Sequence, residues 1–367
     1  MTASSLPHRR LSYIEAGRGF AAVAVVIFHA NASAPRFGGE FWRWPLVGEH
    51  GVDFFFVLSG FIIFTAHAAD LGRPGAGADY LIKRAIRLLP LLWAVVLGWA
   101  LVRFAVGTPT DPRLVLRSML LWPTLERALP LVVWTLRHEV LFYAAFAVLV
   151  IRPRWGAALF AIWGAATVVQ MGLVAAGRPI EGVGSLFLST FTLDFLIGAG
   201  VAVLHREDRL PRGRWVLPAA LAAMVAAVTF EEVAGIGRQG LTDYVSPGAT
   251  FWTPVLGLVF AGVLVGLLAQ ETRGPAPRWA IELGTASYAI YLVHTLVNSI
   301  VQRLLVGLPP LILETGGGHV ALVVAGVVGG VLVHRGFEVP VVRALRQRWL
   351  APPRRPARGL ASPEASR

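Results

Sequence analysis

Cysteine is absent from this 367-residue chain. Its absence excludes disulfides, thiolate nucleophiles and the cysteine-based sites that bind zinc or iron–sulfur clusters. Charged residues are also scarce, because they make up 15% of the chain, against roughly 25% in soluble domains. Hydrophobic residues make up 56%, and the mean hydropathy is +0.64. The two shortages together exclude an ordinary soluble globular protein.

The apolar residues form repeated runs of about 20, the length that an α-helix needs to cross a bilayer. We therefore expect an all-α, polytopic bundle of about ten transmembrane helices. The predicted spans are 15–34, 51–69, 86–106, 129–151, 156–176, 184–204, 215–235, 249–269, 280–305 and 319–339. Together they predict one membrane domain at 1–342. The remainder, 343–367, is basic and Pro-rich, and is expected to be a disordered cytoplasmic tail.

The basic excess, a formal net charge of +12, is distributed as in a membrane protein. The arginines gather in short segments between apolar runs, which argues against nucleic-acid binding. With both termini assigned to the cytoplasm, the inner segments hold more than twice as many Lys and Arg residues as the outer ones. The positive-inside rule therefore predicts that both termini are cytoplasmic.

The first predicted span carries a polar stripe. Arg18 and His29 stand at the two ends of RGFAAVAVVIFH, and eleven steps of 100° return a helix to within about 20° of its starting face. The two side chains are therefore expected on one face, roughly 16 Å apart along the axis. Ionisable groups inside a span are costly and indicate function.

The predicted orientation sorts the other ionisable residues by depth. A candidate acid–base group shares the outer half: His29, Asp53, Glu139 and His294. A candidate phosphate-binding group shares the inner surface: Arg18, Arg84 and Arg87, whose planar guanidinium groups suit phosphate. We expect one water-accessible passage to join the inner arginines to His29.

Six motifs occur along the chain. They are Arg18-x10-His29, HGVDFFFVLSGFII at 50–63, Arg84-x-x-Arg87-x-x-Pro90, WTLxxExxFY at 134–143, Ser287-Tyr288-x-x-Tyr291-x-x-His294, and Glu338-x-Pro340. In this order they resemble the acyltransferase 3 family of integral membrane O-acyltransferases, with Thr135 where serine is commoner. The resemblance covers most of the chain.

The resemblance implies an enzyme of the cytoplasmic (inner) membrane that moves an acyl group, usually acetyl, from acyl-coenzyme A to a hydroxyl group. The implied acceptor is a cell-envelope carbohydrate or another small molecule. Acetyl-coenzyme A would be the donor substrate, with neither a permanently bound cofactor nor a metal. The acceptor's identity, the acyl chain length and the oligomeric state stay open.

Acyl transfer to a hydroxyl needs either a general base or a transient acyl carrier. Without cysteine, His29 is the best candidate for both roles. Asp53 and Glu139 are candidate catalytic partners that would set the tautomer of its imidazole.

The remaining candidate residues bind substrates. Arg18, Arg84 and Arg87 are expected to bind the phosphates of coenzyme A, and Tyr291 and His294 are expected to contact the substrate.

Structural alternatives stand beside these assignments. A histidine can serve helix packing, arginines can merely flank the cytoplasmic side, and acidic residues can neutralise Arg137. Tyr291 and His294 can form an interfacial pair. The alternative function is a transporter or flippase for an anionic or sugar-linked substrate. We find no paired discontinuous helices in two related halves, the pattern that many transporters show.

Overall fold

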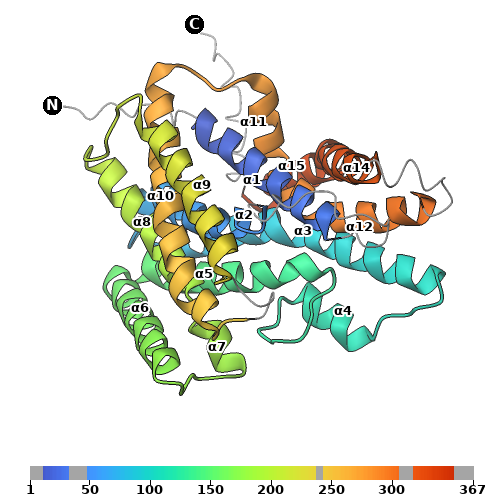
Figure 1. The fold of residues 1–367 in the computed structure, drawn as a ribbon, viewed down its shortest axis with the longest axis horizontal. Helices are drawn as coiled ribbons and strands as arrows, with labels where there is room; N and C mark the ends of the chain where they lie inside the picture. The colour runs from blue at the N-terminus through green and yellow to red at the C-terminus, as the bar shows by residue number, and fades with distance from the viewer. Residues whose placement is uncertain (1–10, 33–47, 237–242, 306–316, 351–367) are drawn as a thin grey trace, which may run out of the picture.

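A computed structural model describes residues 11–32, 48–236, 243–305 and 317–350 (Figure 1). Every regular element in these ranges is helical, which confirms the all-α prediction. The α-helices are α1 (Ser12–Asn31), α2 (Gly51–His67), α3 (Ala76–Ala105), α4 (Pro112–Met119), α5 (Trp134–Ile151), α6 (Pro153–Ala175), α7 (Val183–Phe187), α8 (Phe191–Arg206), α9 (Val216–Ala234), α10 (Thr253–Gln270), α11 (Arg278–Thr285), α12 (Ser287–Leu305), α14 (Gly317–Val333) and α15 (Val339–Trp349).

Short turns of other helix types join several of these elements. The 3₁₀ turns are η3 (Ala68–Asp70), η4 (Leu131–Val133) and η6 (Glu271–Arg273). Two π-helical turns, η5 (Gly248–Trp252) and η7 (His334–Glu338), precede α10 and α15.

Nine helical segments in the described ranges are long and apolar enough to cross a bilayer. The pair α11–α12, bent by 67°, makes a tenth candidate if it crosses as one span. The final segment runs through Gly317–Trp349, because α15 continues α14 beyond η7. The predicted tail boundary at residue 342 therefore falls inside α15, and residues 343–349 are helical.

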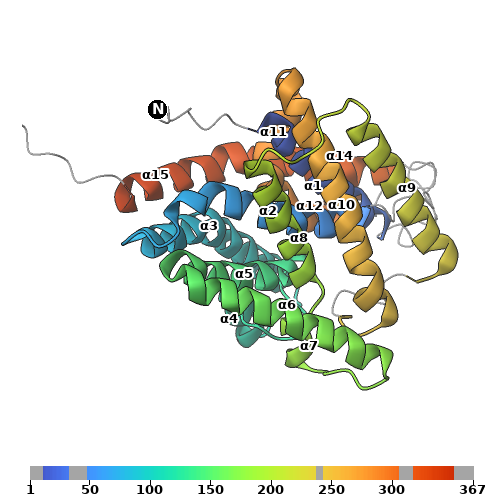
Figure 2. The ribbon, with the colours of Figure 1, turned by 90° about the vertical axis from the view of Figure 1, so that its left-hand side faces the viewer.

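Helices α1 and α2 lie at the centre of the bundle (Figures 1 and 2). On one side α2 packs against α8 and α10, and on the other side α1 packs against α12 and α14. The two helices therefore have protein neighbours on several faces.

Glycines set the closest helix contacts. A Cβ on Gly60 of α2 would overlap the carbonyl oxygen of Phe195 on α8, and a Cβ on Gly198 would overlap that of Val57. Small residues allow such close backbone approach between membrane helices. A similar approach between Gly19 of α1 and Gly284 of α11 brings the start of α12 to the N-terminal half of α1.

Candidate active site

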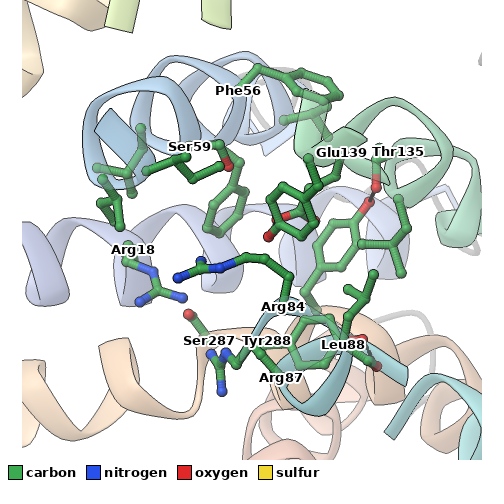
Figure 3. Close-up of a pocket in the computed structure, with 18 residues that line it drawn as sticks. Arg18, Phe56, Ser59, Arg84, Arg87, Leu88, Thr135, Glu139, Ser287 and Tyr288 are labelled. Carbon is green, nitrogen blue, oxygen red and sulfur yellow. Dashed lines mark hydrogen bonds between the residues drawn. The ribbon is translucent and has the colours of Figure 1, made fainter. Parts of the chain in front are cut away.

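A cavity of about 170 Å³ lies between α1, α2, α3, α5 and α12. We call it the inner cavity. Figure 3 shows how its polar side chains gather around one space. Its polar lining residues are Arg18, Ser59, Arg84, Arg87, Thr135, Glu139, Tyr143, Ser287, Tyr288 and Tyr291. Residues from five helices thus meet in one polar pocket of an apolar bundle.

The three predicted donor-binding arginines all line the inner cavity. Arg84 and Arg87 are three residues apart on α3 and so share one face of the helix, whereas Arg18 comes from α1. Figure 3 shows their guanidinium groups close to one another near Ser287. Planar guanidinium groups gathered in this way suit the oxygens of a phosphate group.

Each of these arginines is held in place by side chains around it. Arg18 forms an ion pair with Glu15 at 3.2 Å, and Arg87 forms one with Glu338. The Arg84 guanidinium lies over the rings of Tyr80 and Tyr143, 5.8 and 5.7 Å from their centroids. These contacts fix the direction of the guanidinium groups before any ligand arrives.

Glu139 lies with the arginines in the inner cavity. Its carboxylate accepts a hydrogen bond from the hydroxyl of Tyr143, one helical turn further along α5. The sequence grouped Glu139 with His29 by depth, whereas the structure brings it together with Arg18, Arg84 and Arg87. It therefore supplies a carboxylate next to the cationic centre of the site.

A much wider space of about 1100 Å³ adjoins the inner cavity. We call it the vestibule. It shares Arg18, Ile62 and Arg87 with the inner cavity, and α15 contributes part of its wall. Its polar lining residues are Ser12, Glu15, Arg18, Thr65, Arg87, Thr285, His334, Arg343, Arg346 and Gln347. The two spaces form a wide, basic entrance that leads to a narrow polar pocket.

His29 and His294 form a pair, with ring centroids 4.9 Å apart. Each Nδ1 lies close to the carbonyl oxygen four residues earlier on its own helix, at 2.9 Å for Val25 and 3.0 Å for Ile290. A carbonyl can only accept, so each Nδ1 donates and the neutral ring carries its lone pair on Nε2. That tautomer suits a proton acceptor or a nucleophile.

Tyr291 lies between the inner cavity and the histidine pair. Its ring lines the cavity, and its centroid is 6.2 Å from that of His294. Its hydroxyl donates to the Val132 carbonyl at 3.1 Å and contacts the Thr135 hydroxyl at 2.8 Å. Among the described lining residues of the two spaces, neither histidine occurs, so the expected passage ends at Tyr291.

Asp53 belongs to a buried network at the start of α2. Its carboxylate pairs with His50 Nδ1 at 3.3 Å, and His50 Nε2 pairs with Glu231 of α9 at 3.0 Å. The indole of Trp252 also donates to Glu231, at 2.8 Å. Burial by itself lowers the pKa of His50, but the hydrogen bonds and charges of the two carboxylates outweigh it and raise the pKa to about 9.

Sequence comparison identifies the family of the chain. The sequence model of the acyltransferase 3 family, described as an acyltransferase domain, matches residues 11–335. The chain belongs to the acyltransferase 3 family. It is therefore an acyltransferase, and membership decides against the transporter alternative.

Three acyltransferase 3 relatives align over most of this chain. Exopolysaccharide production protein ExoZ of Rhizobium meliloti is 29% identical over 88% of this chain and 96% of its own length. Acyltransferase MdmB of Streptomyces mycarofaciens is 25% identical over 92% of this chain and 93% of its own length. Putative peptidoglycan O-acetyltransferase YrhL of Bacillus subtilis is 24% identical over 78% of this chain and 48% of its own length. No solved structure matches the chain significantly.

Several residues of the candidate site were not named as candidates from the sequence. Tyr143 follows Glu139 by four residues and His50 precedes Asp53 by three, so helical spacing was a usable signal for both. Helical spacing did not point to Arg343 and Arg346, because the sequence prediction placed both in the disordered tail at 343–367. Within the described ranges, no group of three or more His, Asp or Glu side chains is placed to hold a metal ion.

Proposed function

We propose that this protein is an O-acyltransferase of the cytoplasmic membrane. It moves an acyl group, with acetyl as the first candidate, from acyl-coenzyme A to a hydroxyl group of a cell-envelope carbohydrate. The observation that carries the donor assignment is the gathering of Arg18, Arg84 and Arg87 in the inner cavity, where Arg18 and Arg87 also line the vestibule. The names of two relatives, which refer to exopolysaccharide production and peptidoglycan O-acetylation, support the acceptor class.

The donor binds with its phosphates in the vestibule and its thioester arm in the inner cavity. Guanidinium groups bind phosphate oxygens through paired, charge-assisted hydrogen bonds. Arg18 and Arg87 line both spaces. They therefore bind the donor at the junction between its phosphate groups and its uncharged thioester arm. Glu139 and Tyr143 then flank the arm inside the bundle.

His29 acts at the reacting centre, beyond Tyr291. As a general base, its Nε2 takes the proton of the acceptor hydroxyl while the hydroxyl oxygen attacks the thioester carbonyl. The tetrahedral intermediate collapses, the carbon–sulfur bond breaks, and the thiolate of coenzyme A receives the proton from the imidazolium. His294, 4.9 Å away between ring centroids, faces the same centre and contacts the substrate.

Replacement of His29 tests the catalytic assignment. The purified His29→Ala variant should lose transfer of acetyl from acetyl-coenzyme A to extracted envelope glycans and keep the melting temperature of the wild type. General acid–base catalysis contributes roughly 10²–10⁴-fold to rates, so a loss of that size is expected. His205→Ala on α8, which lies outside both spaces, is the matched control and should stay active. An active His29→Ala variant would remove His29 from the mechanism.

Isotope exchange separates the base from the acyl carrier. A carrier transfers acetyl to the enzyme without acceptor, so labelled coenzyme A would exchange into acetyl-coenzyme A in the absence of glycan. A general base requires the acceptor, and no exchange would occur. We expect no exchange, because His29 is not among the described lining residues of the inner cavity that takes the thioester arm.

Replacement of Arg18 tests the donor site. The Arg18→Ala variant should bind coenzyme A at least about tenfold more weakly, a loss of roughly 1.4 kcal/mol, because one of the gathered guanidinium groups is removed. Arg303→Ala on α12 removes an exposed arginine that bonds to Ser299 and should leave the affinity unchanged. Equilibrium binding of coenzyme A measures both, and an unchanged affinity in Arg18→Ala would refute the docking role.

A further inference from the structure

Helix α15 supplies one wall of the vestibule with cationic side chains. Arg343 and Arg346 both line this space, and a spacing of three residues puts them on one face of the helix. Arg18 and Arg87 line the same space from α1 and α3. The vestibule is therefore basic on the wall formed by α15 as well as at its junction with the inner cavity.

The charges of these arginines are balanced differently. Arg18 and Arg87 each form an ion pair with a carboxylate, Glu15 and Glu338. Within the described ranges, Arg343 and Arg346 form no ion pair, and Glu15 is the sole acidic residue among the vestibule's lining residues. The wall formed by α15 thus keeps an uncompensated positive charge.

The start of α15 is fixed to the rest of the site. Glu338, the last residue of η7, is only 2% exposed. Its carboxylate pairs with Arg87 of α3 and, at 2.7 Å, with His334. Because Glu338 directly precedes α15, this buried contact sets where the helix leaves the bundle and keeps its two arginines over the vestibule.

We propose that Arg343 and Arg346 bind the phosphate groups at the nucleotide end of the acyl donor. This inference rests on the proposed function and assigns donor recognition to α15, outside the inner cavity. The wide vestibule takes the phosphorylated nucleotide, and the uncharged thioester arm continues past Arg18 and Arg87. Donor affinity is thereby divided between a cationic outer wall and the gathered arginines at the cavity.

The test compares donors with and without phosphate. We expect the double variant Arg343→Gln/Arg346→Gln to raise the KM for acetyl-coenzyme A at least tenfold at an unchanged kcat. Its KM for S-acetyl-pantetheine, which has no phosphate, should equal that of the wild type. Arg348→Gln, on the same helix but outside the vestibule lining, is the matched control and should change neither constant. Arg343→Lys/Arg346→Lys should recover part of the loss.

The assay is carried out in nanodiscs of neutral phosphatidylcholine and repeated with added phosphatidylglycerol. A loss that appears only with the anionic lipid would assign α15 to the membrane surface and overturn the proposal. An unchanged KM for acetyl-coenzyme A would overturn it as well, and so would an equal loss with both donors. A wild-type protein that uses neither donor would instead refute the proposed function.

Discussion

At the scale of single residues, backbone carbonyls on α1 and α12 fix the tautomers of the histidine pair. His29 and His294 each donate Nδ1–H to the carbonyl one turn earlier. The sequence prediction gave this role to Asp53 or Glu139. In the structure, Asp53 pairs with His50 and Glu139 accepts a hydrogen bond from Tyr143. A backbone carbonyl cannot be titrated, so it holds the ring in one tautomer over the whole working pH range.

His50 predicts a pH dependence of stability. Its pKa is about 9 in the folded protein against 6.5 as the ordinary value, so the charged imidazole stabilises the fold fully below pH 6.5. This contribution, up to about 3 kcal/mol, is lost as the pH rises through 9. The melting temperature in detergent should therefore fall over this window more for the wild type than for His50→Gln.

The control for this prediction is His205→Gln, which removes a histidine from α8. Its melting temperature should follow that of the wild type across the same pH window. Parallel curves for the wild type and His50→Gln would contradict the assignment of a charged His50 between Asp53 and Glu231.

At the scale of elements, the close crossing of α2 and α8 predicts that two glycine-to-alanine substitutions change the stability of the protein differently. Gly60→Ala would push a methyl group into the Phe195 carbonyl, and overpacking of this kind costs about 1–3 kcal/mol. Gly200→Ala on α8 meets open space and gains helix propensity. Thermal unfolding in detergent should show a lower melting temperature for the first variant and an equal or higher one for the second.

Spacing along one helix was readable from the sequence, and packing between helices was not. The i, i+3 relation of Arg84 and Arg87 correctly predicted that both face one space. The grouping of Glu139 with the arginines depends on how α5 is rotated against α3, and that rotation arises from contacts far apart in the chain. Similarly, the 67° bend before α12 and the close approach of Gly19 to Gly284 involve segments far apart in the chain.

Helix α15 extends past the predicted tail boundary for a compositional reason. Residues 351–367, which lie outside the described residues, are rich in proline and arginine, and the sequence prediction extended this composition back to residue 343. The intervening RALRQRW has no proline and consists largely of good helix formers. It therefore continues the helix that begins at Val339.

At the scale of the whole molecule, the proposed orientation can be tested with single cysteines, because the natural chain contains none. Thr108→Cys follows α3 on the proposed outer side and should react with a membrane-impermeant maleimide in intact cells. Arg209→Cys follows α8 on the proposed inner side and should react only after permeabilisation. The reverse pattern would contradict cytoplasmic termini.

The inner cavity is far narrower than the vestibule, at about 170 against about 1100 Å³. Its far wall is aromatic, since the rings of Phe55 and Tyr291 lie 6.0 Å apart between centroids and hydrogen bonds to Val132 and Thr135 hold the hydroxyl of Tyr291. A longer acyl group in this cavity would overlap these rings, and overpacking of closely packed side chains is destabilising. Under the proposed function, this aromatic wall should limit the length of the acyl group that the inner cavity accepts, and acetyl thioesters should be used in preference to fatty acyl thioesters.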